Sequence, residues 1–560
     1  MSEPATLLEC LWRWEREQPE AIAFTQPVAR DRVVDYSWKQ VADQVRRMAA
    51  HLQSLNLPAN SNIAILGKNS AHWIICDLAI MASGHVSVPL YPTANAETVR
   101  YVLEHSEARL IFIGKLDDLW PVVAPGLPDA LPKIRLPLAP KLNAPDWDGI
   151  VAKTSPTANP SKRDPKELAT ILYTSGSTGR PKGVMISFNA MMETPKGLHQ
   201  IDGAEVKFGD RVLSYLPLAH AAERAVLEAP ALYNGLHVYF AWSLETFLDD
   251  LRRARPVFFF SVPRLWTKFY LGVCEKLPLE KQKKLFRIPL LGRLVKRKIL
   301  KQLGLEHTRV AISGSAPLAA NIIAWYRSLG LELLEGYAMS ENFAYSHGNR
   351  RGKVKLGTVG FCSPGVQCRI SDEGEILVKS PGDMMGYYKD PQTTAASFTP
   401  DGFFKTGDRG SLDADGYLTI TGRVKELFKT AKGKYVAPVP IENKLGNHPS
   451  VEIACVTGVG TPAAFALIQL APELRQRQAA GNDRSAIEQE MESLLVSVNA
   501  TLEPHELLGF IAIVGEPWTM ENGLLTPTMK IKRSEIEKRC GPQAERWFKA
   551  ARKIVWESAV

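Results

Sequence analysis

The chain has 560 residues, of which 45% are hydrophobic and 23% charged, and its formal net charge is +9. This length is more than one hydrophobic core usually serves, so we expect two or more domains. The composition excludes collagen-like and disordered chains. No apolar run reaches the roughly 20 residues that span a bilayer, and the N-terminus does not have the pattern of a secretory signal.

The seven cysteines are odd in number and scattered, with no C-x-x-C pair. This usage predicts reduced, buried thiols in a cytoplasmic protein, and neither a zinc site nor disulfides.

Helical and strand-like patterns alternate along the first part of the chain. Apolar side chains at helical spacing predict an amphipathic N-terminal helix, at Leu7, Leu8, Leu11 and Trp14. Two helical patterns then alternate with two short apolar runs, over residues 37–55, 62–67, 70–84 and 85–91. Such alternation predicts a doubly wound parallel sheet.

Further strand-like runs cover residues 257–263, 309–313 and 331–337. From about Gly357 short alternating segments with many turns predict an antiparallel barrel or ribbon. The predicted fold is therefore α/β. We expect a large N-terminal domain of doubly wound sheets with a β-barrel-like subdomain over 1–422, and a smaller α+β C-terminal domain over 423–560.

Most of the net charge lies in one segment. Residues 276–306 contain ten Lys or Arg and two Glu, a local excess of +8. One interpretation is a solvated pair of basic helices. The other is a surface for anionic lipid headgroups or a polyphosphate, which would place the protein peripherally at the inner face of a membrane. Nucleic acid is not expected, because no recognisable binding module accompanies the charges.

The stretch YTSGSTGRPKGVM, from Tyr173 to Met185, has the composition of a phosphate-binding loop. Small residues let backbone N–H groups approach phosphate oxygens, hydroxyls add donors, and Lys182 supplies a point charge. Its spacing differs from the G-x-x-x-x-G-K-[ST] of P-loop proteins. A loop of another kind is predicted, the alternative being a surface turn.

Four further motifs follow this loop: EGYAMSEN (335–342), GFFKTGDRG (402–410), TGRVKELFKTAKGKYVAP (421–438) and ENGLLTPTMKIKR (521–533). In this order the five closely resemble the motifs of the adenylate-forming superfamily, which includes acyl-CoA synthetases, luciferases and peptide-synthetase adenylation domains. The resemblance covers roughly residues 30–545. Within the superfamily the chain is most similar to the long-chain fatty acid–CoA ligases, through residues 214–224, 261–266, 276–306 and 313–318.

The resemblance implies an AMP-forming acid–thiol ligase that uses ATP, Mg²⁺ and CoA. A fatty acid would attack the α-phosphorus of ATP, pyrophosphate would leave, and the CoA thiol would displace AMP from the acyl-adenylate. The loop would stabilise the departing charge of the β- and γ-phosphates. Its ATP-binding residues would be Thr174, Ser175, Gly176, Ser177, Thr178, Gly179 and Lys182.

The other motifs imply the remaining nucleotide contacts. Glu341 and Thr178 would ligate Mg²⁺, a hard cation that prefers oxygen. Asp408 and Arg423 would reach the ribose. The adenine and α-phosphate contacts would come from Gly314, Ser315, Ala316, Gly336, Tyr337 and Ser340, where Ser340 replaces the commoner Thr and Ala338 stands where Gly is usual.

The resemblance also implies a mobile C-terminal domain with Lys425 at its hinge and Gly433 at the CoA-binding tunnel. Lys530 matches the catalytic lysine of the family better than Lys532 does, and its ammonium would orient the carboxylate and the α-phosphate.

His220 matches a catalytic and acyl-pocket position, with a core histidine as the alternative. Trp266 resembles a gate residue of the acyl tunnel, and a core tryptophan is an equal alternative. The protein is expected to be a monomer or homodimer. Two other functions stay open: an enzyme that passes the acyl group to a carrier protein or forms a β-lactone, and an inactive relative that only binds ligands.

Overall fold

The computed structural model describes residues 3–174, 180–199, 206–431, 433–479, 484–519, 522–526 and 530–557. The chain divides into two compact units. Unit 1 comprises Met1–Ala316, Asn321–Gln367 and Val378–Phe404, and unit 2 comprises Pro317–Ala320, Cys368–Leu377 and Lys405–Val560. The predicted α/β class, with a large N-terminal and a separate C-terminal domain, is confirmed, while the boundary at 422–423 stays a prediction. None of the described helices is long and apolar enough to cross a membrane.

A seven-stranded sheet of unit 1 confirms the predicted parallel core, since β3 pairs parallel with β4 and β5, and β4 with β7. Its order is β18-β8-β7-β4-β3-β5-β6. The strands are β3 Asn62–Leu66, β4 Val86–Leu90, β5 Leu110–Ile113, β6 Lys133–Arg135, β7 Leu168–Thr174, β8 Lys182–Ser187 and β18 Gly386–Tyr387.

Unit 1 has two further sheets. The first has the order β2-β1-β10-β9, with β1 Ile22–Ala29, β2 Arg32–Ser37, β9 Arg211–Ser214 and β10 His237–Phe240. The second has the order β11-β12-β13-β14-β15, with β11 Phe258–Ser261, β12 Val310–Ser313, β13 Leu333–Tyr337, β14 His347–Gly348 and β15 Phe361–Cys362.

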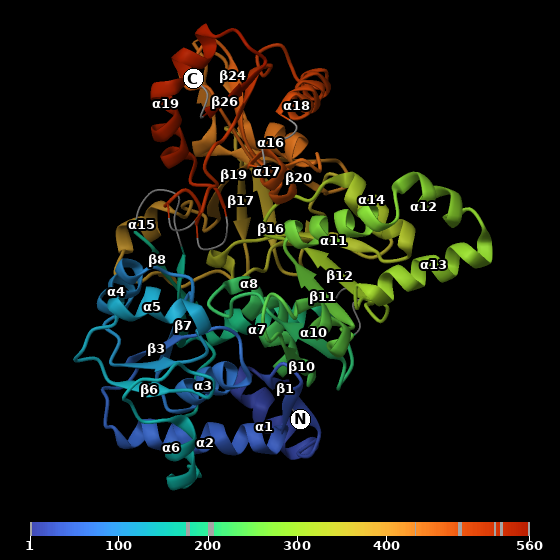
Figure 1. Cartoon of the computed structure of the whole chain (residues 1–560). Helices are drawn as coiled ribbons and strands as arrows, with labels where there is room; N and C mark the ends of the chain where they lie inside the picture. The colour runs from blue at the N-terminus through green and yellow to red at the C-terminus, as the bar shows by residue number, and fades with distance from the viewer. Residues whose placement is uncertain are drawn as a thin grey trace. The chain divides into compact units, whose positions relative to one another are not determined.

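Helices flank these sheets, except for α12 and α13, which project away from them (Figure 1). They are α1 Leu7–Glu17, α2 Trp38–Ser54, α3 Ala71–Ala82, α4 Ala96–His105, α5 Trp120–Val123, α6 Trp147–Lys153, α7 Phe188–His199, α8 Ala221–Glu223, α9 Ala229–Asn234, α10 Phe247–Ala254, α11 Pro263–Lys276, α12 Leu279–Phe286, α13 Pro289–Gln302, α14 Ala320–Leu329 and α15 Pro391–Ala396. Short 3₁₀ turns are η1 Asp117–Leu119, η2 Ala124–Gly126 and η4 Ser340–Asn342, and η3 Arg224–Glu228 is a π-helical turn.

Local chemistry explains the predicted helices. The Ser37 hydroxyl accepts from the Gln40 backbone N–H while the Gln40 side chain accepts from the Ser37 N–H, a capping box that begins α2. Helix α3 is apolar except for His72 and Asp77, and every residue in it is buried, as expected of a helix enclosed in the core.

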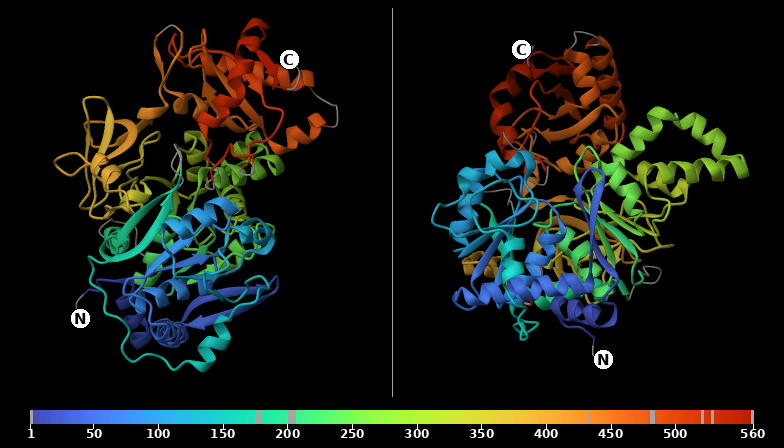
Figure 2. Two further views of the ribbon diagram at one scale, coloured as in Figure 1. Left: turned by 90° about the vertical axis from the view of Figure 1, so that its left-hand side faces the viewer. Right: turned by 60° about the horizontal axis from the view of Figure 1, so that its bottom comes forward.

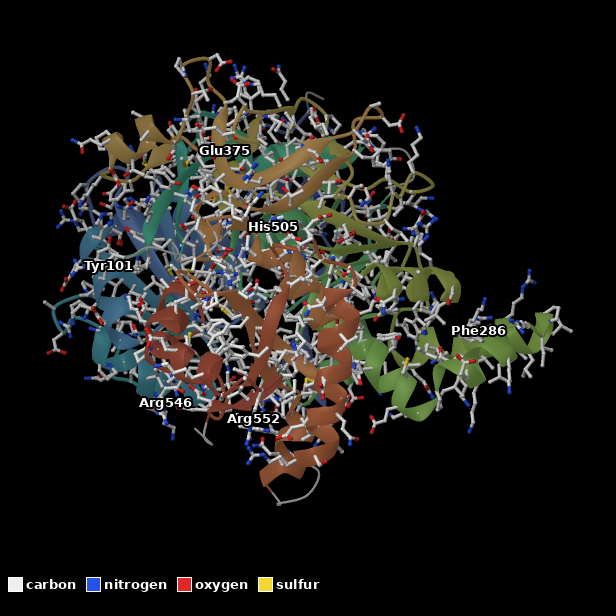
Figure 3. The ribbon with its side chains drawn as sticks, turned by 90° about the horizontal axis from the view of Figure 1, so that it is seen from above. Tyr101, Phe286, Glu375, His505, Arg546 and Arg552 are labelled. Carbon is white, nitrogen blue, oxygen red and sulfur yellow. The ribbon has the colours of Figure 1, made fainter. Side chains whose placement is uncertain are left out.

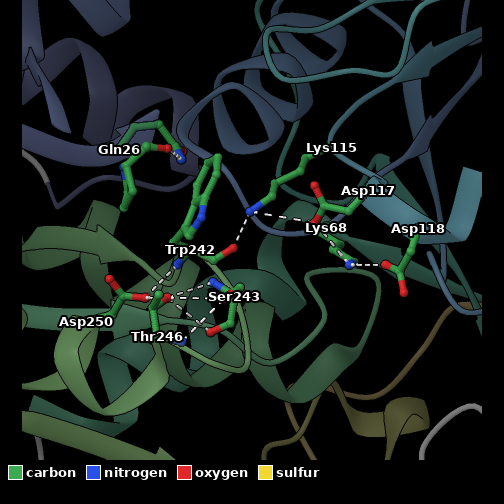
Figure 4. Close-up of polar contacts among 10 residues, drawn as sticks. Gln26, Lys68, Lys115, Asp117, Asp118, Trp242, Ser243, Thr246 and Asp250 are labelled. Carbon is green, nitrogen blue, oxygen red and sulfur yellow. Dashed lines mark hydrogen bonds and ion pairs between the residues drawn. The ribbon is translucent and has the colours of Figure 1, made fainter. Parts of the chain in front are cut away.

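The buried Lys115 connects two segments of unit 1, each of which follows a strand of a different sheet (Figure 4). Lys115 follows β5, and its ammonium donates to the backbone O of Trp242, which follows β10. The same nitrogen lies 3.9 Å from the Trp242 ring centroid and 3.8 Å from Asp117. Burial lowers the pKa of Lys115, and these partners satisfy its charge.

Most of a four-stranded sheet, in the order β16-β17-β19-β20, lies in unit 2; its strands are β16 Gln367–Ile370, β17 Glu375–Lys379, β19 Phe404–Leu412 and β20 Leu418–Arg423. It occupies the region where a barrel or ribbon is expected. A short hairpin follows, of β21 Phe428–Lys429 and β22 Tyr435–Val436.

The core of unit 2 is a second four-stranded sheet, β23 Val451–Thr457, β24 Ala464–Leu470, β25 Leu508–Ile513 and β26 Ile554–Trp556. Its two faces contribute to different apolar clusters. Val456 and Ile468 belong to one cluster, and Phe465 and Leu467 belong to the other. The helical elements are η5 Val424–Glu426, α16 Pro438–Gly446, α17 Pro472–Ala479, α18 Arg484–Asn499 and α19 Arg533–Lys549.

Candidate functional site

In unit 1, the carboxyl ends of two parallel strands bring two of the predicted motifs together. Strands β12 and β13 pair with Ser313 opposite Glu335, so Gly314 and Gly336 follow at the same edge. A Cβ on Gly314 would lie 3.0 Å from Phe260 and 3.4 Å from the Gly336 carbonyl oxygen. Ser315 has a φ of +70° and begins a tight turn that continues to Ala316. Carboxyl ends of parallel strands are the usual place for ligands in such sheets.

The chain turns sharply after β13, and this turn sets the position of Glu341. The Met339 N–H donates to Asn342 Oδ1 at 3.1 Å, which opens the 3₁₀ turn that contains Ser340 and Glu341. The Glu341 carbonyl accepts from the Met384 N–H at 2.7 Å. Tyr337, at the end of β13, is half-buried, with its ring centroid 6.0 Å from that of His347.

Tyr387 connects Glu341 to the base of the predicted phosphate loop. Its hydroxyl donates to Glu341 Oε1 at 2.9 Å, and the ammonium of Lys182 lies 5.1 Å from its ring centroid. Burial, and then the Glu341 charge, raise the pKa of Tyr387 well above its usual range, so the hydroxyl stays a donor. Sequence reasoning did not single out Tyr387. Its signal is the aromatic pair in MMGYYKD.

The ends of the loop itself are paired, with Thr174 opposite Lys182 across β7 and β8. The Pro181 carbonyl accepts from the Tyr101 hydroxyl at 3.2 Å. The remaining predicted phosphate contacts lie outside the described residues, namely Ser175, Gly176, Ser177, Thr178 and Gly179.

His220 is the N-cap of α8, where its Nδ1 accepts from the Ala222 N–H at 3.0 Å. It is half-buried, and its ring meets that of Tyr91 edge-on at 6.3 Å between centroids. The acyl-pocket role of His220 and the alternative of a core histidine both stay predictions.

Buried ionisable side chains directly after His220 hold its helix in place. Glu223 accepts from the Ser214 hydroxyl at 2.8 Å and the Tyr215 N–H at 3.1 Å, and its burial raises its pKa to about 8. Arg224, fully buried, forms ion pairs with Asp77 and, at 2.7 Å, with Glu228. Buried charges need such partners. The motif PLAHAAER contains Glu223 and Arg224, but it does not reveal the residues with which they form hydrogen bonds and ion pairs.

Trp266 is fully buried in unit 1. Its Nε1 donates to the Ile312 carbonyl at 3.3 Å, and its ring packs edge-on against Phe259 and Tyr326. This is the packing of a core tryptophan, and its contribution to an acyl tunnel stays a prediction.

In unit 2, Asp408 and Arg423 are opposite each other on β19 and β20. The Arg423 Nε donates to Asp408 Oδ1 at 2.8 Å, and the Asp408 side chain is 13% exposed against 46% for Arg423. The Asp408 N–H donates to the Thr406 hydroxyl at 3.1 Å. The two predicted ribose residues are therefore brought together from positions fifteen apart in the sequence.

The other predicted residues of unit 2 lie in its connections. Lys425 lies in η5. Gly433, between β21 and β22, has a φ of +75°, a conformation that favours glycine. Lys530 is exposed, and its backbone N–H donates to the Thr526 hydroxyl at 3.0 Å. Lys532 is half-buried and is the N-cap of α19.

The described residues contain no group of three or more His, Cys, Asp or Glu side chains that could hold a metal. Glu341 supplies one half-buried carboxylate. Mg²⁺ usually takes one or two carboxylates and completes its shell with substrate phosphates and water. The Glu341 donor therefore fits Mg²⁺ held beside a nucleotide.

Comparison with known proteins agrees with the predicted resemblance. The AMP-binding enzyme family model matches residues 11–388, and the AMP-binding enzyme C-terminal domain model matches residues 426–551. The long-chain-fatty-acid–CoA ligase FadD15 of Mycobacterium bovis is 32% identical over 95% of this chain and 95% of its own. The peroxisomal long chain acyl-CoA synthetase 6 of Arabidopsis thaliana is 30% identical over 93% of this chain and 81% of its own.

Solved structures share the fold. The adenylation domain of a carboxylic acid reductase from Segniliparus rugosus, in complex with AMP and a co-purified carboxylic acid, has a TM-score of 0.79 at 22% identity. It covers 98% of this chain and 94% of its own. The anthranilate CoA ligase AuaEII, in complex with anthranoyl-AMP, has a TM-score of 0.76 at 20% identity and covers 96% and 98%. With both domain models matched and relatives aligned over nearly the whole length, the chain belongs to the family of AMP-binding enzymes.

Proposed function

We propose that this protein is a long-chain fatty acid–CoA ligase that converts ATP, a fatty acid and CoA into acyl-CoA, AMP and pyrophosphate by way of an acyl-adenylate. The observation that carries the proposal is the 32% identity, over 95% of both chains, to a relative named as such a ligase. The reaction needs two half-reactions, because a carboxylate is a poor electrophile until it acquires a good leaving group.

The unit 1 residues would bind the nucleotide. Glu341 and Thr178 would hold Mg²⁺, which supplies charge neutralisation at the phosphates when bound. Tyr337 would stack on adenine beside the turn of Gly314, Ser315 and Ala316 and next to Gly336, with Ser340 near the α-phosphate. Thr174, Lys182 and the loop between them would stabilise the pyrophosphate as it leaves.

The unit 2 residues would complete the chemistry. Asp408 would accept hydrogen bonds from the ribose hydroxyls, with Arg423 holding that carboxylate. Lys530 would place an ammonium against the substrate carboxylate and the α-phosphate and so offset the charge that develops between them. Lys425 would act as the hinge, and Gly433 would lie against the pantetheine arm of CoA.

His220 and Trp266 would contribute to the acyl pocket. We further propose a cytoplasmic protein, because its seven cysteines are all free thiols. That it is a monomer or homodimer stays a prediction.

The direct test is product analysis. Purified protein with ATP, Mg²⁺, palmitate and CoA should release AMP and pyrophosphate and form palmitoyl-CoA, and carboxylates of graded chain length would define the preference. ADP and phosphate as products would contradict the proposal. Adenylation without thioester formation on CoA would favour transfer to a carrier protein or β-lactone formation.

The assignment of Lys530 has its own test. Lys530→Ala should lose adenylation by about two orders of magnitude or more, because it removes a charge that acts in the transition state. It should still convert supplied acyl-adenylate and CoA into thioester. Lys532→Ala is the matched control and should keep both steps. Equal loss of both steps in Lys530→Ala would show that Lys530 has another role.

A further inference from the structure

Helices α12 and α13 form a basic hairpin, residues 276–302, that projects from unit 1 (Figures 1 and 2). Phe286, at the end of α12, marks it in Figure 3. All of its residues are described, and nine of its ten Lys and Arg side chains are exposed. The tenth, Lys296, is half-buried with its ammonium 5.0 Å from the Phe286 ring centroid.

The base of the basic hairpin is firmly packed. Gln282 is buried, donates to the Leu277 carbonyl at 2.7 Å and accepts from the Trp325 indole N–H at 2.8 Å. The Gln302 carbonyl, at the end of α13, accepts from Arg252 at 2.8 Å. The projection is therefore a fixed element that presents a defined surface.

The tip of the basic hairpin exposes aliphatic side chains. Leu290 is 79% exposed, Leu294 67% and Ile288 50%. Leu290 and Leu294 lie on one face of α13, and the spacing of Arg297 and Lys301 continues that face. Gly292 and Ile299, on the opposite face, are buried. The outward face is thus apolar in the first turns of α13 and basic in the last.

We propose that the basic hairpin docks on an anionic lipid bilayer, with Ile288, Leu290 and Leu294 in the interface and the basic row on the headgroups. Aliphatic side chains flanked by Lys and Arg are the pattern of interfacial binding. Nucleic acid fits less well, because the exposed large hydrophobic residues of this segment are all Leu or Ile, which offer no ring for base stacking. The proposal extends beyond the ligase activity and does not depend on it.

Co-sedimentation of the full chain with phosphatidylcholine vesicles, with and without phosphatidylglycerol, tests the docking at low and high salt. Binding should require the anionic lipid and should weaken with salt, because screening shortens the reach of surface charges. Binding to neutral vesicles alone, or binding to RNA but to no vesicle, would overturn the proposal.

Three variants locate the surface. The first variant reverses three charges, Arg297→Glu/Lys298→Glu/Lys301→Glu. It should weaken vesicle binding at least about thirtyfold. The second variant removes the apolar tip, Leu290→Ser/Leu294→Ser. It should weaken vesicle binding about tenfold and leave the salt dependence of binding unchanged. The third variant, Lys549→Glu/Arg552→Glu/Lys553→Glu, is the control for the first. It makes the same change in net charge on exposed residues of unit 2 and should bind vesicles like the unmodified protein. Circular dichroism confirms folding, and equal loss in the control would overturn the location.

Discussion

Tyr387 joins an acidic and a basic side chain that reach it from other motifs, since its hydroxyl bonds to Glu341 and its ring lies under Lys182. A hydrogen bond to a charged carboxylate contributes about 1.5–3 kcal/mol, enough to fix the orientation of that carboxylate. At the scale of the residue, Tyr387 is therefore a positioning residue for the proposed Mg²⁺ ligand.

The substitution Tyr387→Phe removes this hydroxyl and keeps the ring. We expect the Mg²⁺ concentration for half-maximal pyrophosphate exchange to rise about tenfold, with little change in the thermal unfolding midpoint. Tyr388→Phe is the control, because its hydroxyl accepts from Asn62 at 3.2 Å instead. An unchanged Mg²⁺ dependence in Tyr387→Phe would show that the bond does not position Glu341.

Glu223 makes the stability of unit 1 dependent on pH. Burial raises its pKa from 4.5 in an unfolded chain to about 8 in the fold, despite the hydrogen bonds that it accepts. The unfolded chain therefore releases this proton first as pH rises. The contribution of Glu223 to the unfolding free energy is therefore most favourable below about pH 4.5, and it is lost progressively up to about pH 8.

Thermal or urea unfolding between these pH values, compared with Glu223→Gln, isolates the effect. The difference in unfolding free energy should change by up to about 1.4 kcal/mol per pH unit, because one proton is involved. The amide keeps the acceptor for Ser214 and Tyr215 and has no proton to lose. Parallel pH profiles for the two proteins would contradict a raised pKa of Glu223.

At the scale of the element, the basic hairpin depends on a close approach between its helices. A Cβ on Gly292 of α13 would lie 2.9 Å from the Phe286 carbonyl oxygen at the end of α12. Backbone cannot move aside as a side chain can, so only glycine fits without displacing one helix.

We expect Gly292→Ala to destabilise the basic hairpin by about 1–3 kcal/mol, seen as faster hydrogen exchange over residues 279–302. Gly272→Ala in α11 is the matched control, because its Cβ would meet nothing within 4 Å. There the better helix propensity of alanine should stabilise by about 0.5–1 kcal/mol. Stabilisation by both substitutions would mean that the helices pack less closely.

At the scale of the whole molecule, the two units have separate apolar cores. Trp38 packs in the main cluster of unit 1, with its ring 6.3 Å from that of Phe24. Trp547 packs in a cluster of unit 2, with its ring 6.1 Å from that of Phe465 and 6.2 Å from that of Phe510. Separate cores predict separate unfolding transitions.

Differential scanning calorimetry tests this division. Trp547→Ala should lower the midpoint temperature of the smaller endotherm, because it reduces the unfolding free energy of unit 2 by about 3–5 kcal/mol. The larger endotherm should stay in place. Trp38→Ala should do the reverse. A single endotherm that shifts as one in both variants would show that the units unfold together.

Features that depend on neighbouring residues follow from the sequence alone. Helices α2 and α3 and strands β3 and β4 follow from periodicity and capping, and the predicted parallel sheet is confirmed. The motif residues were identified from short patterns because a phosphate loop or a strand-end turn is built within a few residues. The family followed from the order of those motifs.

Contacts between side chains that are distant in the sequence depend on the tertiary fold. The Tyr387–Glu341 bond joins positions 46 apart, and Arg224 pairs with Asp77 across 147 positions. No periodicity contains such a partnership, because it depends on the order of strands in a sheet and on the turns between them. The burial that raises the pKa of Glu223 and the exposure of Leu290 are likewise properties of packing, which the identity of a residue does not fix.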